Sequence, residues 1–270
     1  MKFGLIGAGN MGGTLLKAAL KKGFLTEKEA IIYDVNDTQI AKFQSDYPVK
    51  AAENNVELVK EADVVLLGVK PVFLGGVLEE IKAVSGGKAL ISIAAGWSLD
   101  MINDALGEDH SAMVMRVMPN TPALVGEGYT AICEETSFTE EWIEWARAFF
   151  ACSGQFATIP ERLIDAVIAV TGSSPAYIYT LIDAMAMGGV KLGMPRAMAV
   201  QAAAQAVLGS AKMVLETGEH PCKLRDDVCS PGGTTIVAVD VLKETGYESS
   251  IIKAMTACAE RNREMTSKKV

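Results

Sequence analysis

The stretch GLIGAGNMG, residues 4–12, constrains the fold of this chain more than any other segment. Its glycines have the spacing G-x-G-x-x-G, they follow an apolar run that predicts a strand, and they open a segment that predicts a helix. Glycines in this setting permit a tight turn and let a pyrophosphate approach the amides at the helix start. We therefore expect a dinucleotide site whose contacts in this loop are Gly7, Gly9, Asn10, Met11 and Gly12.

Strand-like and helix-like segments alternate from residue 1 to about residue 160. The strand candidates are continuous apolar runs, as in a parallel sheet covered on both faces. They are residues 2–7, 30–34, 62–69, 88–94, 112–118 and 129–134. Helices are expected at residues 10–22, 56–62 and 98–106, the last with Ser98 as its N-cap and Gly107 after its end. This pattern predicts an α/β fold with a Rossmann-like, doubly wound sheet over residues 1–160.

Residues 161–270 have a different pattern, because strand signals stop and Ala, Met and Leu recur at helical spacing as far as Glu264. Pro175 and Pro195 stand where helices would begin. The segment 198–211 is small and apolar on nearly every face, and such a helix must be buried. One layer of helices offers little to cover it. We therefore expect an all-α C-terminal domain that forms a homodimer.

Composition narrows the class of ligand. The net charge is −8 and the pI is near 5.0, which argues against nucleic acid, because phosphate backbones require Lys and Arg patches. No apolar run reaches the roughly 18 to 20 residues of a membrane span, and the opening residues are too short for a secretion signal. Two histidines and five widely spaced cysteines offer no zinc motif. We expect no membrane, nucleic acid or metal partner, a cytoplasmic location and a small-molecule ligand.

Several loops follow the strand candidates, at the edge where open α/β sheets bind ligands. Asp34 ends the second strand, where a carboxylate accepts hydrogen bonds from the adenosine ribose; it would serve equally well as a cap of the next helix. The loops GVKP, AAG and RVMPNTP add Val69, Lys70, Pro71, Ala95, Gly96 and Asn120. Each loop alone fits an ordinary turn, but their convergence on one edge predicts a nicotinamide pocket.

A second glycine loop lies near the end of the chain, in CSPGGTTIVAVDVLK, residues 229–243. Amides left free at a helix N-terminus, beside glycines that admit a ligand, bind carboxylates or phosphates. Because the dinucleotide loop lies at the other end of the sequence, this loop needs a different anionic ligand or has a structural role.

The chain resembles the pyrroline-5-carboxylate reductase family over essentially its whole length. GLIGAGNMG, GVKP, RVMPNTP, TGSSPAY and LRDDVCSPGGTTIVAVDVLK occur in the family's order, and the last is the most specific. The resemblance implies a Rossmann domain and then a helical dimerisation and substrate-binding domain, residues 161–270. It implies reduction of the C=N bond of the imino acid 1-pyrroline-5-carboxylate to L-proline, with NADPH or NADH as the hydride donor. It also implies a homodimer with interleaved helical domains, which some members assemble into a decamer.

The resemblance assigns residues to the second loop and to the cofactor. It implies a substrate carboxylate cradle of Ser230, Gly232, Gly233, Thr234 and Thr235, with the Thr235 hydroxyl as the catalytic group near the imine nitrogen. The alternative is that Thr235 or Thr234 caps the helix. Asn55 matches a family asparagine near the adenosine ribose. The resemblance implies that members preferring NADPH carry a basic or hydroxyl-bearing loop after the second strand. This sequence has Asp34, Val35 and Asn36 there. Asp34 therefore favours NADH, and the preference between NADH and NADPH stays open.

Two other functions fit parts of the sequence. A β-hydroxyacid dehydrogenase has a similar opening motif but uses a lysine in its interdomain helix, and the segment VIAVTGSSPAYIYTLIDAM has none. Lys191 follows GGV without the surrounding glycine pattern of that family. A dinucleotide sensor without catalysis is the second alternative, because a fold does not determine a function.

Overall fold

The computed structural model describes residues 1–267, and contacts divide this part of the chain into two compact units. The sheet unit comprises Met1–Gly172 together with the described segment that begins at Cys258, and the helical unit comprises Ser173–Ala257. Contacts therefore group residues 161–172 with the sheet. The functional boundary expected after residue 160 stays a prediction.

The strands within residues 1–267 form one sheet. Their bounds are β1 Phe3–Ile6, β2 Ala30–Tyr33, β3 Lys50–Ala51, β4 Val64–Leu67, β5 Ala89–Ser92, β6 Met113–Met118, β7 Gly128–Thr136 and β8 Gly154–Ile159. Their order is β3-β2-β1-β4-β5-β6-β7-β8. The first six strands are parallel, whereas β7 runs antiparallel to β6 and parallel to β8. The order of the first six is that of a Rossmann sheet, which confirms the predicted fold class.

Helices connect these strands. In the sheet unit they are α1 Asn10–Lys21, α2 Asp37–Asp46, α3 Asn55–Glu61, α4 Pro71–Ile81, α5 Leu99–Leu106, α6 Glu140–Ala151 and α7 Ile164–Val167, with short turns η1 Lys82–Val84, η2 Thr121–Val125, η3 Glu161–Leu163 and η4 Ile168–Gly172. The structure adds α2, α4, α6, β3 and β8 to the elements expected from sequence. The pair Gly75 and Gly76 obscures the helical character of α4, because glycine is a poor helix former.

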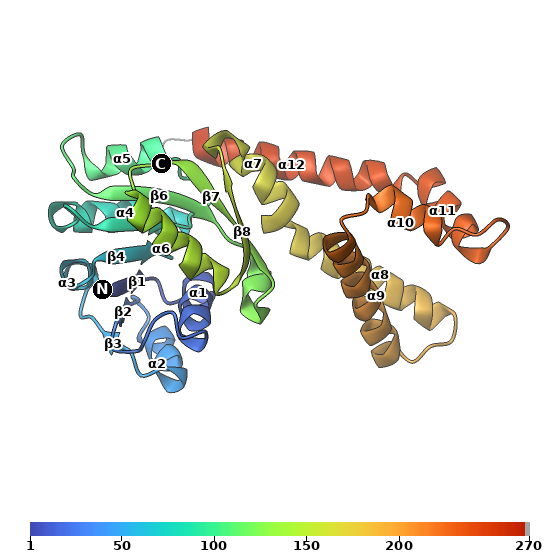
Figure 1. Cartoon of the computed structure of the whole chain (residues 1–270), viewed down its shortest axis with the longest axis horizontal. Coiled ribbons are helices and arrows are strands. Elements are labelled where there is room, and N and C mark those ends of the chain that lie inside the picture. Colours follow the sequence, from blue (N-terminus) through green and yellow to red (C-terminus); the bar gives the residue numbers. More distant parts are fainter. Residues whose placement is uncertain (268–270) are drawn as a thin grey trace. The chain divides into compact units, whose positions relative to one another are not determined.

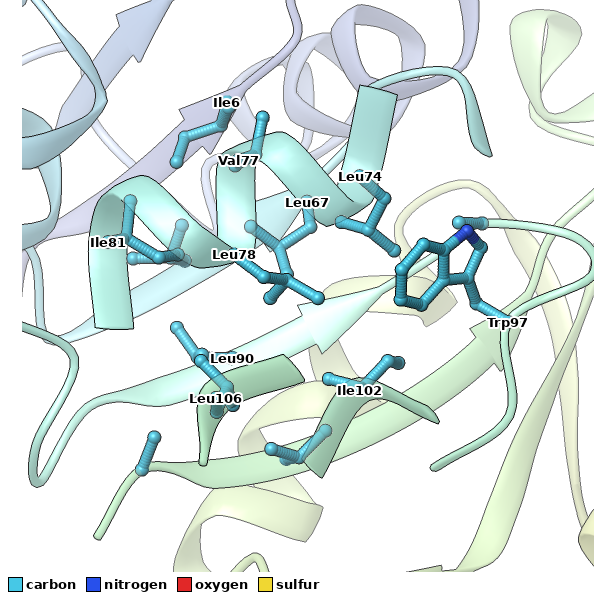
Figure 2. Close-up of a cluster of buried hydrophobic side chains, with 14 of the residues drawn as sticks. Ile6, Leu67, Leu74, Val77, Leu78, Ile81, Leu90, Trp97, Ile102 and Leu106 are labelled. Atoms are coloured by element: carbon cyan, nitrogen blue, oxygen red, sulfur yellow. The ribbon is translucent and has the colours of Figure 1, made fainter. Parts of the chain in front are cut away.

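Both faces of the sheet are covered, and the strand residues alternate between two apolar clusters. On one face α3, α4 and α5 pack over strand residues such as Leu67 and Leu90. Figure 2 shows part of this cluster, with Leu74, Leu78 and Ile81 projecting from α4. On the other face α1 and α6 pack over residues that include Leu5 and Leu66. A parallel sheet buried on both faces explains the continuous apolar runs in the sequence.

The helical unit contains α8 Ser174–Lys191, α9 Arg196–Thr217, α10 Pro221–Asp227, α11 Thr234–Glu244 and the first part of α12 Tyr247–Ser267. Figure 1 shows the strands side by side in the sheet unit and α8 next to α9 in the helical unit. Ser98 and Gly107 cap α5 as expected, with the Ser98 hydroxyl accepting from the Met101 amide. Ser173 is the N-cap residue of α8.

Helix α9 is largely uncovered in the protomer and corrects one expectation from the sequence. In the protomer it buries only Ala199 and Ala203, while Leu208, Met213 and other large apolar side chains are exposed. Its length and composition are sufficient for a membrane crossing, which corrects the expectation that no segment reaches that length. Only 11% of its most apolar window is buried in the protomer. The helix therefore leaves a large apolar surface uncovered by its own chain.

Candidate functional site

The glycine turn after β1 has the geometry that the motif requires. Gly7 has φ +92°, and a Cβ there would lie 2.7 Å from the carbonyl carbon of Gly68. A Cβ on Gly12 would lie 2.5 Å from the Gly7 carbonyl oxygen, so this glycine lets α1 pack against the turn. Gly9 is the N-cap of α1, and within the described chain no side chain caps the helix amides there. These amides are therefore available to an anion.

A cavity of about 650 Å³ opens beside this turn, at the carboxyl ends of β1, β2 and β4. Its walls contain the predicted residues Gly7, Gly9, Asp34, Asn36, Asn55, Val69 and Lys70. Val35 and Gly68, from loops already named, also line it. The other lining residues were not predicted from the sequence: Ile6, Tyr33, Gln39, Val72, Phe73, Gly76, Val77 and Glu80. Several come from α4, which was not predicted, so nothing in the sequence pattern connected them to the site. The volume and the mixture of apolar walls with a few polar groups suit part of a dinucleotide.

Asp34 and Asn36 form the rim that follows β2. The Asp34 Oδ1 accepts from the Asn36 amide at 2.9 Å. The Asn36 side chain in turn accepts from the Thr38 amide at 3.0 Å and is the N-cap of α2. The alternative that Asp34 caps this helix is therefore wrong. Its Oδ2 has no hydrogen-bond partner in residues 1–267, so one carboxylate oxygen remains available at the cavity.

Asn55 is the most constrained polar side chain in the cavity wall. It is 5% exposed, and its Nδ2 donates to Glu80 Oε2 at 2.7 Å. Its Oδ1 is buried and has no hydrogen-bond partner among the described residues. A buried acceptor without a donor is destabilising, and such groups are rare in proteins. Asn55 therefore brings to the cavity wall a buried acceptor that lacks a donor in the described chain.

The other predicted cofactor residues lie outside the wall of this cavity. Asn10 is exposed at the start of α1, and Met11 is half-buried against the apolar cluster beneath it. Pro71 begins α4, and its carbonyl accepts from the Trp97 indole at 2.9 Å. All three lie in or beside the segments that form the cavity, and their contact with a cofactor stays a prediction.

Ala95, Gly96 and Asn120 follow β5 and β6. Gly96 has φ +76°, and a Cβ there would meet the Met265 side chain at 3.4 Å. Both ends of the Asn120 side-chain amide form hydrogen bonds with backbone groups. Its Nδ2 donates to the Thr171 carbonyl at 3.0 Å, and its Oδ1 accepts from the Tyr129 amide at 2.8 Å. Asn120 thus ties the loop after β6 to its neighbours, and direct cofactor contact stays a prediction.

The second glycine loop lies in the helical unit. Gly232 has φ +67°, and the Gly233 amide donates to the Ser230 carbonyl at 3.0 Å. A Cβ on Gly233 would clash with the Ser230 hydroxyl. Gly233 is the N-cap of α11, with no side-chain cap in the described chain, and Thr234 and Thr235 are the first two helical residues. The alternative that either threonine is the N-cap is therefore wrong, and the first amides of α11 remain open to an anion.

Thr234 and Thr235 differ in exposure. Thr234 is exposed, whereas Thr235 is half-buried. Neither hydroxyl has a hydrogen-bond partner in residues 1–267, so neither is occupied by a structural bond. The more enclosed hydroxyl is the better candidate for contact with a small substrate.

An ion pair between the buried Arg116 and the half-buried Glu161 has a structural role in the sheet unit. Arg116 is 4% exposed and donates from Nη1 to Glu161 Oε1 at 2.6 Å, and the same oxygen accepts from the Leu99 amide at 2.9 Å. The pair joins β6 to the segment after β8 and to the start of α5.

Nearby, burial raises the pKa of the Cys133 thiol to about 12. This thiol is therefore protonated, and not nucleophilic, at neutral pH. Residues 1–267 contain no cluster of three His, Cys, Asp or Glu residues placed to hold a metal.

Comparisons with known proteins agree with this arrangement. A family model described as pyrroline-5-carboxylate reductase dimerisation matches residues 161–265, and one described as NADP oxidoreductase coenzyme F420-dependent matches residues 2–96. The pyrroline-5-carboxylate reductase of Escherichia coli (strain K12) is 43% identical over 266 residues, 98% of each chain. That of Methanosarcina acetivorans is 40% identical over 268 residues, 99% of this chain and 98% of the relative.

Solved structures match both units. The crystal structure of Plasmodium falciparum pyrroline carboxylate reductase with NADP bound superposes with a TM-score of 0.90 at 28% identity, covering 99% of this chain and 98% of that one. The 1-pyrroline-5-carboxylate reductase of Streptococcus pyogenes gives a TM-score of 0.86 at 32% identity, covering 98% of each chain. Since relatives well above 30% identity match nearly its whole length, this chain belongs to the pyrroline-5-carboxylate reductase family.

Proposed function

We propose that this chain is an oxidoreductase that reduces 1-pyrroline-5-carboxylate to L-proline with NADPH or NADH, the last step of proline biosynthesis. The observation that carries the proposal is the start of α11, where a Gly-Gly turn leaves helix amides uncapped beside the Thr235 hydroxyl. The reaction adds hydride to the carbon of a C=N bond, so it requires a dinucleotide site and a carboxylate site. The chain has a candidate for each.

The cavity beside β1 fits a nicotinamide dinucleotide. Gly7 and Gly9 supply the close approach for a pyrophosphate, and the open amides of α1 supply its hydrogen bonds. Asp34 and Asn55 each have one acceptor oxygen without a partner in residues 1–267, and such acceptors suit ribose hydroxyls. When bound, the reduced nicotinamide supplies the hydride.

The substrate carboxylate is held, in this proposal, by the backbone amides of Thr234 and Thr235 at the start of α11. The Thr235 hydroxyl oxygen accepts a hydrogen bond from the N–H of the ring nitrogen and positions the C=N carbon for reduction. The reacting species is the protonated iminium, whose nitrogen takes up the C=N electron pair as hydride adds to carbon. No buried general base is needed, which agrees with the absence of a histidine from both loops.

The oligomer and its location complete the proposal. The match to a dimerisation family supports oligomerisation through the helical unit. We propose that the oligomer is a homodimer in which a second copy covers α9, with further assembly to a decamer open to measurement. Cys133, Cys152, Cys222 and Cys229 are free thiols in the described chain, which supports a reducing, cytoplasmic location.

The test measures the absorbance of reduced nicotinamide on addition of 1-pyrroline-5-carboxylate, with NADH and NADPH in separate assays. We expect oxidation of the cofactor and stoichiometric formation of proline. Parallel assays with hydroxy acids and the oxidised cofactors test the dehydrogenase alternative and should show no turnover. Tight cofactor binding without turnover of any substrate would instead support the sensor.

A further inference from the structure

The Asn55–Glu80 pair does more than join two helices. Asn55 begins α3 and Glu80 lies in the last turn of α4, and both line the cavity proposed for the cofactor. Glu80 is exposed and forms no ion pair within residues 1–267, although Glu79 beside it pairs with Lys82 at 2.6 Å. Its one hydrogen bond in that range is the bond to Asn55 Nδ2 at 2.7 Å.

The chemistry of a carboxylate determines how the amide of Asn55 is oriented. An ionised carboxylate only accepts hydrogen bonds, whereas an asparagine amide has one end that donates and one that accepts. Glu80 therefore selects the rotamer in which the Asn55 NH₂ faces Glu80 and Oδ1 lies on the opposite side. That oxygen is the buried acceptor that has no donor within the described residues. The selected orientation thus leaves Asn55, a residue of the cavity wall, with a buried acceptor that lacks a donor within residues 1–267.

We infer that Glu80 is a positioning residue, which locks the Asn55 amide so that its Oδ1 accepts from a hydroxyl of the adenosine ribose. The inference rests on the proposed function, because it requires the dinucleotide to occupy this cavity. Ribose hydroxyls are the donors that a dinucleotide presents near the carboxyl end of β2 in this fold. Without Glu80 the amide would rotate freely and would present its NH₂ to the same hydroxyl for part of the time.

The experiment measures the Kd of NADH and of NADPH by fluorescence titration for the intact dimer, together with Tm and with kcat at saturating cofactor. Glu80→Ala should weaken NADH binding about tenfold, the effect of one lost hydrogen bond, with kcat unchanged. Asn55→Ala should do the same. The double variant should bind no more weakly than Asn55→Ala, because Glu80 acts only through Asn55. Glu79→Ala is the matched control and should bind both cofactors as the wild type does.

Glu80→Gln separates orientation from charge. Its side-chain oxygen still reaches the Asn55 NH₂, so we expect NADH binding within about threefold of the wild type. A Glu80→Ala variant with unchanged Kd, losses that multiply in the double variant, or a Glu80→Gln variant as weak as Glu80→Ala would each overturn the inference. A wild-type chain that binds neither reduced cofactor would contradict the proposed function itself.

Discussion

The position of Thr235 in α11 allows its proposed catalytic role to be tested separately from helix capping. It is the second residue of α11, behind an N-cap glycine, so its hydroxyl is not needed to begin the helix. Thr234 precedes it with the same side chain in a more exposed place. The two threonines therefore form a natural pair of variants.

Thr235→Val keeps the shape of the side chain and removes the hydroxyl. A lost positioned acid or transition-state hydrogen bond typically costs about 10²-fold in rate, although water can replace part of it. We expect kcat/KM to fall at least about tenfold, with the Kd of the cofactor unchanged. Thr234→Val should leave both unchanged. Equal small effects from the two substitutions, in steady-state assays, would show that the loop acts through its backbone alone.

Asp34 should limit the use of NADPH. Its free carboxylate oxygen at the cavity would face a 2′-phosphate at about 5 Å, where like charges repel by about 3 kcal/mol at an effective dielectric near 20. Solvent reduces this repulsion, so we expect Asp34→Ser to raise the NADPH/NADH ratio of kcat/KM about tenfold. Asp37→Ser is the control, because Asp37 carries a similar charge outside the cavity wall. An unchanged ratio in Asp34→Ser would place the 2′-phosphate elsewhere.

Cys133 should make the free energy of unfolding fall as pH rises through the alkaline range. Burial raises the pKa of its thiol from an ordinary value of about 9 to about 12. Between these values the unfolded chain has lost a proton that the folded chain retains, so the unfolded state binds fewer protons and stability falls as pH rises. In urea unfolding the wild type should lose up to about 1.4 kcal/mol per pH unit relative to Cys133→Ala. Parallel pH curves for the two proteins would contradict this assignment.

At the scale of elements, the two glycines that frame the start of α1 have separable roles. A Cβ on Gly12 would meet the Gly7 carbonyl oxygen at 2.5 Å and Leu5 Cδ1 at 2.8 Å, whereas a Cβ on Gly9 would meet nothing within 4 Å. Gly12 thus determines how closely α1 packs on β1. Gly9 determines how closely a ligand approaches the helix start.

Alanine at each position tests this division. Gly12→Ala forces a backbone contact in a packed core, so we expect a loss of about 1–3 kcal/mol in the free energy of unfolding and weaker NADH binding. Gly9→Ala should leave the free energy of unfolding nearly unchanged and should still weaken NADH binding. Denaturant unfolding and fluorescence titration measure the two effects. A Gly9→Ala variant with normal binding would mean that the pyrophosphate does not approach this turn.

For the molecule as a whole, the uncovered surface of α9 supports the proposed homodimer. A helix with exposed Leu208, Met213 and Leu215 would leave a large apolar patch on a monomer, and such patches mark interfaces. Gln201 and Gln205 within the same helix suit a protein interface better than a lipid environment.

Ala204→Glu would place a charge in that interface, where an unpaired buried charge costs several kcal/mol. We expect the variant to be monomeric or aggregated in sedimentation equilibrium and to lose activity. Ala83→Glu, on an exposed turn of the sheet unit, should remain a dimer with normal activity. A soluble dimeric Ala204→Glu enzyme would contradict the interface assignment.

Features that depend on local pattern were predictable from the order of amino acids alone. Continuous apolar strands predicted the covered parallel sheet, and the spacing of Gly7, Gly9 and Gly12 predicted the turn, because both follow from backbone geometry over a few residues. Resemblance in motifs identified the family before the structure did. Contacts between residues far apart in sequence could not be predicted in this way. Gly75 and Gly76 hid the helical pattern of α4, so Phe73 and Glu80 were not assigned to the cavity.

Roles that depend on contacts between distant residues became assignable from the folded arrangement. Asp34 and Thr235 each had a capping alternative, and the structure assigned the caps to Asn36 and Gly233 instead. The bond from Asn55 to Glu80 joins residues 25 apart in sequence. Sequence patterns report which local conformations are favourable. A hydrogen bond between two helices depends on how those helices pack against the sheet, and the packing exists only in the folded chain.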